Sequence, residues 1–104
     1  MTFQKIEKII VQTLQDLIES LSIKEVDKLN RETVLFGDRG ILDSMGLVSL
    51  ITDLEEKFEQ ESNVSIILAD ERAMSQKRSP FRTVSSLSEY IFGLIKERKQ
   101  DEKD

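Results

Sequence analysis

Three stretches of this chain repeat apolar residues every three or four positions, and this spacing constrains the fold more than any other feature. Such spacing places apolar side chains along one face of an α-helix. It predicts helices over residues 3–21, 44–60 and 84–98. With 104 residues and 38% hydrophobic content, the chain can bury one modest core. The predicted stripes are Phe3, Ile6, Ile10, Leu14, Leu17 and Leu21, then Leu47, Leu50, Ile51, Leu54 and Phe58, then Val84, Leu87, Tyr90 or Ile91, Leu94 and Ile95.

We therefore expect an all-α helical bundle that forms a single domain over residues 1–104. Residues 99–104 are charged, and we expect them to be a frayed tail. The long connection at residues 22–43 is too apolar to be disordered, with Val34, Leu35 and Phe36 as its anchors on the core. Thr2 and Thr83 precede the first and last predicted helices and are candidate N-caps.

Residues 40–50 join this connection to the second predicted helix, and Ser44 stands at the junction. Its hydroxyl is expected to be the N-cap, accepting a hydrogen bond from a free backbone N–H of the first turn. A cap lies at the surface end of a helix, so the hydroxyl should be accessible to another protein. If the Asp-Ser pair stood alone before an apolar run, helix capping by itself would explain the presence of the serine.

The chain contains no cysteine and no histidine. Disulfides, thiolate metal sites and a cysteine nucleophile are therefore excluded. The commonest general base and zinc ligand is missing, and a Ser-His-Asp triad cannot be built from this chain alone. We expect no catalytic residues, no metal site and no independent enzyme activity.

Acidic residues gather on the second predicted helix. Residues 41–61 hold six carboxylates and one positive charge, that of Lys57. Their net charge of −5 equals the net charge of the whole chain. Such a surface disfavours nucleic acid and favours basic partner proteins, although a merely solvated helix face is an equal alternative. No apolar run is long enough to span a bilayer and the N-terminus lacks a signal-peptide core, so we expect a cytoplasmic protein that does not enter a membrane.

The pattern around Ser44 resembles the prosthetic-group site of acyl carrier proteins. It reads Leu-Phe-x-x-x-Gly-Ile-Leu-Asp-Ser-Met over residues 35–45, and the start of the last helix, Thr-Val-x-x-Leu-x-x-Tyr-Ile, is similar to that family as well. The resemblance implies that Ser44 carries a covalent 4′-phosphopantetheine arm, with Asp43 as the adjacent motif residue. A phosphopantetheinyl transferase would load the arm from coenzyme A, and the arm's thiol would hold cargo as a thioester.

The resemblance also implies an acyl-carrier-like architecture, with three main helices plus a short extra helix over residues 69–74. Residues 63–68 would be an extended connector that buries Ile66 and Leu68. The chain is expected to be monomeric, and its partners are the transferase and acyl-transferring or synthase enzymes. The expected docking residues are Met45, Val48, Asp53, Glu55 and Glu56.

The main interpretation is a discrete carrier of acyl intermediates for fatty-acid, polyketide or related lipid biosynthesis. Two features depart from the pattern of fatty-acid carriers. Those carriers are often acidic at the positions of Gly46 and Ser49, and they are usually acidic where residues 77–82 of this chain are basic. The Gly-Ile-Leu-Asp-Ser-x-Gly run is also similar to D-alanyl carrier proteins. The alternatives are therefore a D-alanyl, aminoacyl or peptidyl carrier, or a carrier-like module that receives no arm and only binds a protein.

Overall fold

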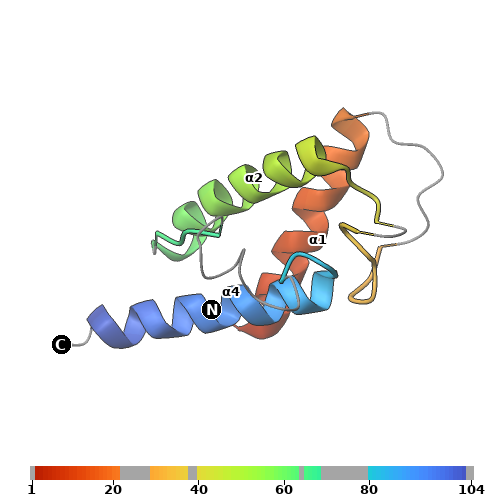
Figure 1. Cartoon of the computed structure of the whole chain (residues 1–104). Helices are drawn as coiled ribbons and strands as arrows, with labels where there is room; N and C mark the ends of the chain where they lie inside the picture. The colour runs from red at the N-terminus through yellow and green to blue at the C-terminus, as the bar shows by residue number, and fades with distance from the viewer. Residues whose placement is uncertain (1, 22–28, 38–39, 64, 69–79, 103–104) are drawn as a thin grey trace.

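The computed structural model describes residues 2–21, 29–37, 40–63, 65–68 and 80–102, and within them it contains three long helices. They are α1 (Phe3–Ser20), α2 (Ser44–Ser62) and α4 (Val84–Glu102). Helix α1 packs against both α2 and α4 (Figure 1). The predicted all-α, acyl-carrier-like bundle of three main helices is confirmed. The short extra helix predicted at residues 69–74 lies outside the described residues.

The core forms where the apolar faces of the three helices meet the segments that connect them. Leu54 and Phe58 of α2 are fully buried, as their spacing predicts. Ile66 and Leu68 are buried as predicted, and the described residues 65–68 form neither helix nor strand. The other buried apolar residues are Ile6, Ile10, Leu14, Leu17, Ile18, Leu35, Leu42, Leu50, Ile51, Phe81, Val84, Leu87, Ile91 and Ile95.

The structure corrects the predicted stripes and helix ends in three places. Leu21 is 47% exposed and not part of the core, because α1 ends at Ser20 and Leu21 is its C-cap. Helix α2 runs two residues further than predicted and stops at Asn63, whose φ of 56° is left-handed. Helix α4 continues to Glu102, four residues beyond the predicted end at residue 98; the frayed tail stays a prediction. In that helix Ile91, and not the half-buried Tyr90, holds the core position.

Residues 31–35, which we call the strap, bind the start of α4 through backbone hydrogen bonds. The N–H groups of Val84 and Ser85 donate to the carbonyl oxygens of Thr33 (3.1 Å) and Arg31 (2.8 Å). The N–H of Leu35 donates to the carbonyl oxygen of Arg82 at 2.7 Å. The strap therefore supplies acceptors to first-turn N–H groups that a helix cannot satisfy by itself.

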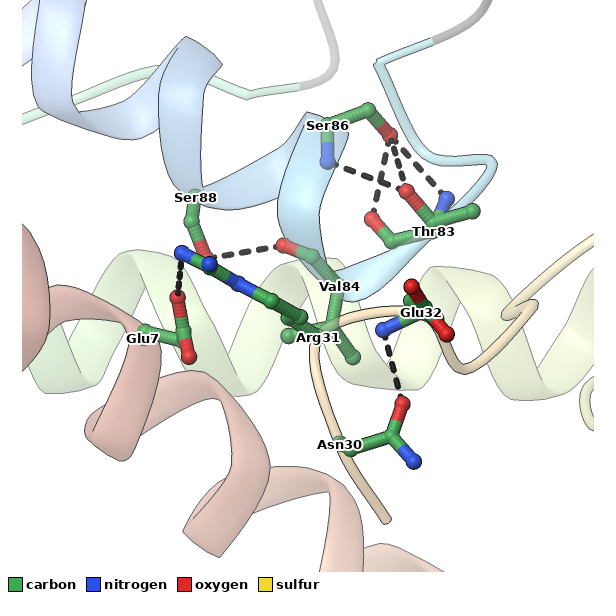
Figure 2. A network of polar contacts seen from close by, with 8 residues as sticks. All are labelled: Glu7, Asn30, Arg31, Glu32, Thr83, Val84, Ser86 and Ser88. Atoms are coloured by element: carbon green, nitrogen blue, oxygen red, sulfur yellow. Dashed lines mark hydrogen bonds and ion pairs between the residues drawn. The ribbon is translucent and has the colours of Figure 1, made fainter.

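Side chains complete this junction (Figure 2). Thr83 caps α4 as predicted, because its Oγ1 accepts the N–H of Ser86 at 3.0 Å. The Ser86 hydroxyl in turn accepts the N–H of Thr83 at 3.0 Å. On the strap, the guanidinium of Arg31 forms an ion pair with Glu7 of α1 at 3.2 Å. The strap thus connects the starts of α1 and α4.

The same strap also holds the residues that lead into α2. The N–H groups of Ile41 and Leu42 donate to the carbonyl oxygens of Val34 (3.1 Å) and Leu35 (2.9 Å). Leu35 and Leu42 are both buried. The chain immediately before Ser44 is therefore held by backbone hydrogen bonds and by the burial of Leu42.

Candidate functional site

Ser44 is the first residue of α2, and the predicted N-cap role belongs to Asp43 instead. Asp43 has the extended backbone of a cap, with φ −84° and ψ −174°. Its Oδ1 accepts the N–H of Gly46 at 2.8 Å, and its carbonyl oxygen accepts the N–H of Leu47 at 2.9 Å. Aspartate and serine are both good caps, and here the cap falls one residue earlier than the sequence indicates. The exposed Ser44 hydroxyl is therefore not used to stabilise the helix.

The first turn around Ser44 is open to an anionic substituent. Within the part of the chain that the structure describes, the N–H groups of Ser44 and Met45 donate to no acceptor. Free N–H groups and the helix dipole together make a helix N-terminus favourable for negative charge. The geometry combines an accessible hydroxyl with a neighbourhood that tolerates a phosphate ester.

Two glycines give this turn its shape. A Cβ on Gly40 would lie 2.6 Å from the Cα of Phe36, so only glycine allows the loop to close at this position. A Cβ on Gly46 would lie 3.3 Å from Oδ1 of Asp43 and 3.2 Å from Cδ2 of Leu42. Glycine at position 46 thus leaves room for the capping carboxylate and for the buried leucine. Close packing explains both glycines of the Gly-Ile-Leu-Asp-Ser-x-Gly run.

Two apolar side chains are exposed next to Ser44. Met45 is 79% exposed and Val48 is 61% exposed, one helical turn apart on α2. A group of large apolar side chains exposed to water often marks a surface that another protein covers. Their exposure agrees with the predicted docking role, which stays a prediction.

The three acidic docking candidates differ in their surroundings. Asp53 and Glu56 are exposed. Glu55 is half-buried, and its Oε2 accepts the backbone N–H of Leu68 at 2.7 Å. Glu55 therefore holds the connector onto α2, and it is the least available of the three to another protein.

The described residues lack two further features. No group of three or more acidic side chains among them is arranged to hold a metal ion. None of the described helices is both long and apolar enough to cross a membrane.

These observations define a class: a small helical bundle that presents one accessible serine at the start of its second helix, as carrier proteins do. The chain is 40% identical over 47 residues to a D-alanyl carrier protein of Streptococcus suis (strain 05ZYH33), and the match covers 45% of this chain and 57% of that relative. The aligned region thus spans a little over half of the relative's length. No family model and no solved structure matches the chain.

The match confirms the predicted resemblance to the phosphopantetheine-binding carrier protein family. Carrier proteins of this family hold a covalently bound phosphopantetheine arm and are not enzymes. The name of this relative agrees with the D-alanyl alternative, and the fatty-acid or polyketide role stays a prediction.

Sequence reasoning missed the strap and the capping role of Asp43. The strap joins residues about fifty positions apart through backbone atoms, and such bonds leave no pattern of side chains. The capping role of Asp43 could have been predicted, because its side chain can reach the N–H of the residue three positions later, Gly46. Sequence reasoning also missed Thr13, a buried threonine in the apolar stripe of α1 between Ile10 and Leu17.

Proposed function

We propose that this chain is a carrier protein on which Ser44 is the attachment point of a 4′-phosphopantetheine arm. The observation that carries the proposal is the separation of roles at the start of α2, where Asp43 caps the helix and the exposed Ser44 hydroxyl is left free. The arm supplies a flexible thiol that this cysteine-free chain lacks. The chain's own residues provide the attachment oxygen and a surface that a transferase can dock on.

The first turn fits a phosphodiester. The unpartnered N–H groups of Ser44 and Met45 favour negative charge at this end of α2. Gly46 is buried, and its missing side chain leaves room for the capping carboxylate of Asp43. Met45 and Val48 are the proposed apolar contacts for the transferase and for the enzymes that use the arm, and Asp53 and Glu56 are the proposed charged contacts.

For the cargo, we propose D-alanine or another small amino acid. Support comes from the similarity to the D-alanyl carrier protein and from Gly46, which belongs to a run that resembles such carriers. A single domain over residues 1–104, a monomeric state and a cytoplasmic location stay predictions.

Mass spectrometry of the intact protein tests the attachment. Incubation with coenzyme A and a phosphopantetheinyl transferase should add one phosphopantetheine group to the parent protein and none to Ser44→Ala. Ser49→Ala is the matched control, because it removes another serine of the same helix and should load as the parent does. Loading of Ser44→Ala, or no loading of the parent with several transferases, would contradict the proposal.

A competition on the loaded protein tests the cargo. The holo-protein is offered to an ATP-dependent D-alanine-activating ligase and, separately, to a fatty-acid-activating acyl carrier synthetase. We expect a D-alanyl thioester and little fatty acylation. Efficient fatty acylation without D-alanylation would return the interpretation to a lipid carrier while leaving the attachment at Ser44 intact.

A further inference from the structure

Met45 carries the only sulfur atom in the part of the chain that the structure describes, and it follows Ser44 directly on α2. Its side chain is 79% exposed, the highest value among the exposed large apolar side chains of the described residues. The chain has no cysteine, so the thioethers of its three methionines are its softest nucleophiles before an arm is attached. An exposed thioether is open to a two-electron oxidant, which converts it to a sulfoxide.

The fold does not depend on the Met45 side chain. The residue is absent from the buried core, and the first turn of α2 is capped by Asp43, whose carboxylate accepts the N–H of Gly46 at 2.8 Å. The residues that lead into α2 are held by the strap and by the burial of Leu42. None of these contacts uses the thioether. A polar change on Met45 can therefore alter the surface without unfolding the domain.

Met45 shares an exposed apolar surface with Val48, which is 61% exposed and lies one helical turn further along α2. A partner protein that covers the two side chains gains free energy because apolar surface leaves water. A sulfoxide makes the methionine side chain polar and disrupts interfaces that bury it. Burying such a polar group without a hydrogen-bond partner is costly. One added oxygen atom on Met45 thus opposes protein contact beside Ser44.

We propose that Met45 is a reversible oxidation site that controls the loading of Ser44. A peroxide transfers one oxygen atom to the thioether: the O–O bond breaks, an S–O bond forms, sulfur loses two electrons and the remainder of hydrogen peroxide leaves as water. A methionine sulfoxide reductase reverses the step with a dithiol, which becomes a disulfide as the oxygen leaves in water. The oxidised protein is folded but docks poorly on the phosphopantetheinyl transferase. This consequence rests on the proposed function, because Met45 affects loading only if Ser44 is the attachment point.

The test uses unloaded Met74→Leu protein, which lacks the other internal methionine and keeps Met45. Hydrogen peroxide is added and then removed with catalase before the transferase and coenzyme A are supplied. Peptide mass spectrometry should show one added oxygen atom on Met45. The KM of the transferase for the oxidised protein should rise by about three- to tenfold with kcat nearly unchanged, because docking is weakened and the chemical step is not. Unaltered kinetics of protein fully oxidised at Met45 would overturn the proposal.

Met45→Leu is the matched control, because it keeps a large apolar side chain and removes the sulfur atom. Whatever the loading rate of this variant, peroxide should not change it. Met45→Gln places a permanently polar side chain at the same position and should raise the KM without any oxidant. A loss of loading in peroxide-treated Met45→Leu would overturn the proposal, since the sensitive atom would then lie elsewhere.

Two measurements separate a switch from damage. Treatment of the oxidised protein with methionine sulfoxide reductases for both sulfoxide epimers should restore the KM of the untreated protein. The melting temperature should be nearly the same before and after oxidation, because Met45 lies outside the core. A large fall in melting temperature, or a loss of loading that reduction does not restore, would contradict a reversible switch at the surface.

The same assay distinguishes failure of this proposal from failure of the attachment at Ser44. If the untreated protein is not loaded by any transferase, the attachment and its control by Met45 both fall. If the untreated and the oxidised protein load equally well, the attachment stands and the control by Met45 alone is overturned.

Discussion

The starts of α2 and α4 are built in opposite ways. At α4 the strap's carbonyl oxygens accept the N–H groups of Val84 and Ser85. Thr83 and Ser86 cap each other there (Figure 2). At α2 one carboxylate, that of Asp43, caps the helix, and the described residues offer no acceptor to the two N–H groups before Gly46.

The difference separates a structural helix start from one that is available for chemistry. A start whose donors are all satisfied internally has little to gain from a ligand. A start with free donors and an exposed hydroxyl can accept a substituent without losing a bond. The strap serves both, because it closes one junction and holds the chain that leads into the other.

The largest expected effect is that Ser44→Ala and Ser86→Ala change opposite properties, loading in the first variant and stability in the second. Ser44→Ala should abolish loading by a phosphopantetheinyl transferase and leave thermal stability nearly unchanged, since Asp43 is the cap. Ser86→Ala should load normally and lose about 1 kcal/mol of stability, because its hydroxyl bonds to Thr83 and Pro80. Mass spectrometry and urea denaturation measure the two properties. A large stability loss in Ser44→Ala would remove the contrast.

The loop into α2 should be more sensitive to an added methyl group than the interior of α4. Gly40→Ala places a Cβ against the backbone of Phe36 and should destabilise the protein by about 1–3 kcal/mol. In α4, a Cβ at Gly93 meets nothing within 4 Å, so Gly93→Ala should stabilise by up to about 1 kcal/mol through helix propensity. Chemical denaturation of both variants gives the comparison. Equal effects would mean that the loop is not tightly closed.

Removing either cap should cost about 0.5–2 kcal/mol of stability, but with different consequences for loading. Asp43→Ala frees the N–H of Gly46 beside Ser44 and should slow the transferase as well. Thr83→Ala acts at the other junction and should leave the loading rate of the folded protein unchanged. Single-turnover loading at a temperature where both variants are folded checks this. Equal slowing by both would indicate that the two starts are coupled.

The smallest effect is expected from the ion pair that joins the strap to α1. Arg31 is exposed and its pairing with Glu7 is accessible to salt, so Glu7→Gln should cost at most about 1 kcal/mol. The difference from the parent should shrink with added salt. Melting temperatures at low and high ionic strength measure it. A salt-independent loss would indicate that Glu7 acts through packing.

The sequence predicts the three helices and their buried faces because side-chain periodicity is a local property. Leu54, Phe58 and Leu87 are buried where the spacing places them. Thr83 is a cap, as predicted, because a threonine before an apolar run has few other roles. Leu21 fits the same spacing and is exposed, since periodicity does not indicate where a helix stops.

The site is only partly predictable. Ser44 follows from the motif, but the choice between Asp43 and Ser44 as cap depends on one residue of register, and both side chains can cap. The strap depends on backbone atoms brought together by packing.

The capping role of Asp43 has a thermodynamic consequence. Because the helix keeps its bond whether or not Ser44 is substituted, adding the arm changes the folding free energy only by the effect of a charge near a helix end, about 0.3–1 kcal/mol. A closed cycle of folding and modification then requires that substitution be almost equally favourable on the unfolded and folded chains. The proposed arm therefore gives the folded chain little equilibrium advantage, and we expect a transferase to select the folded chain through the surface that it recognises.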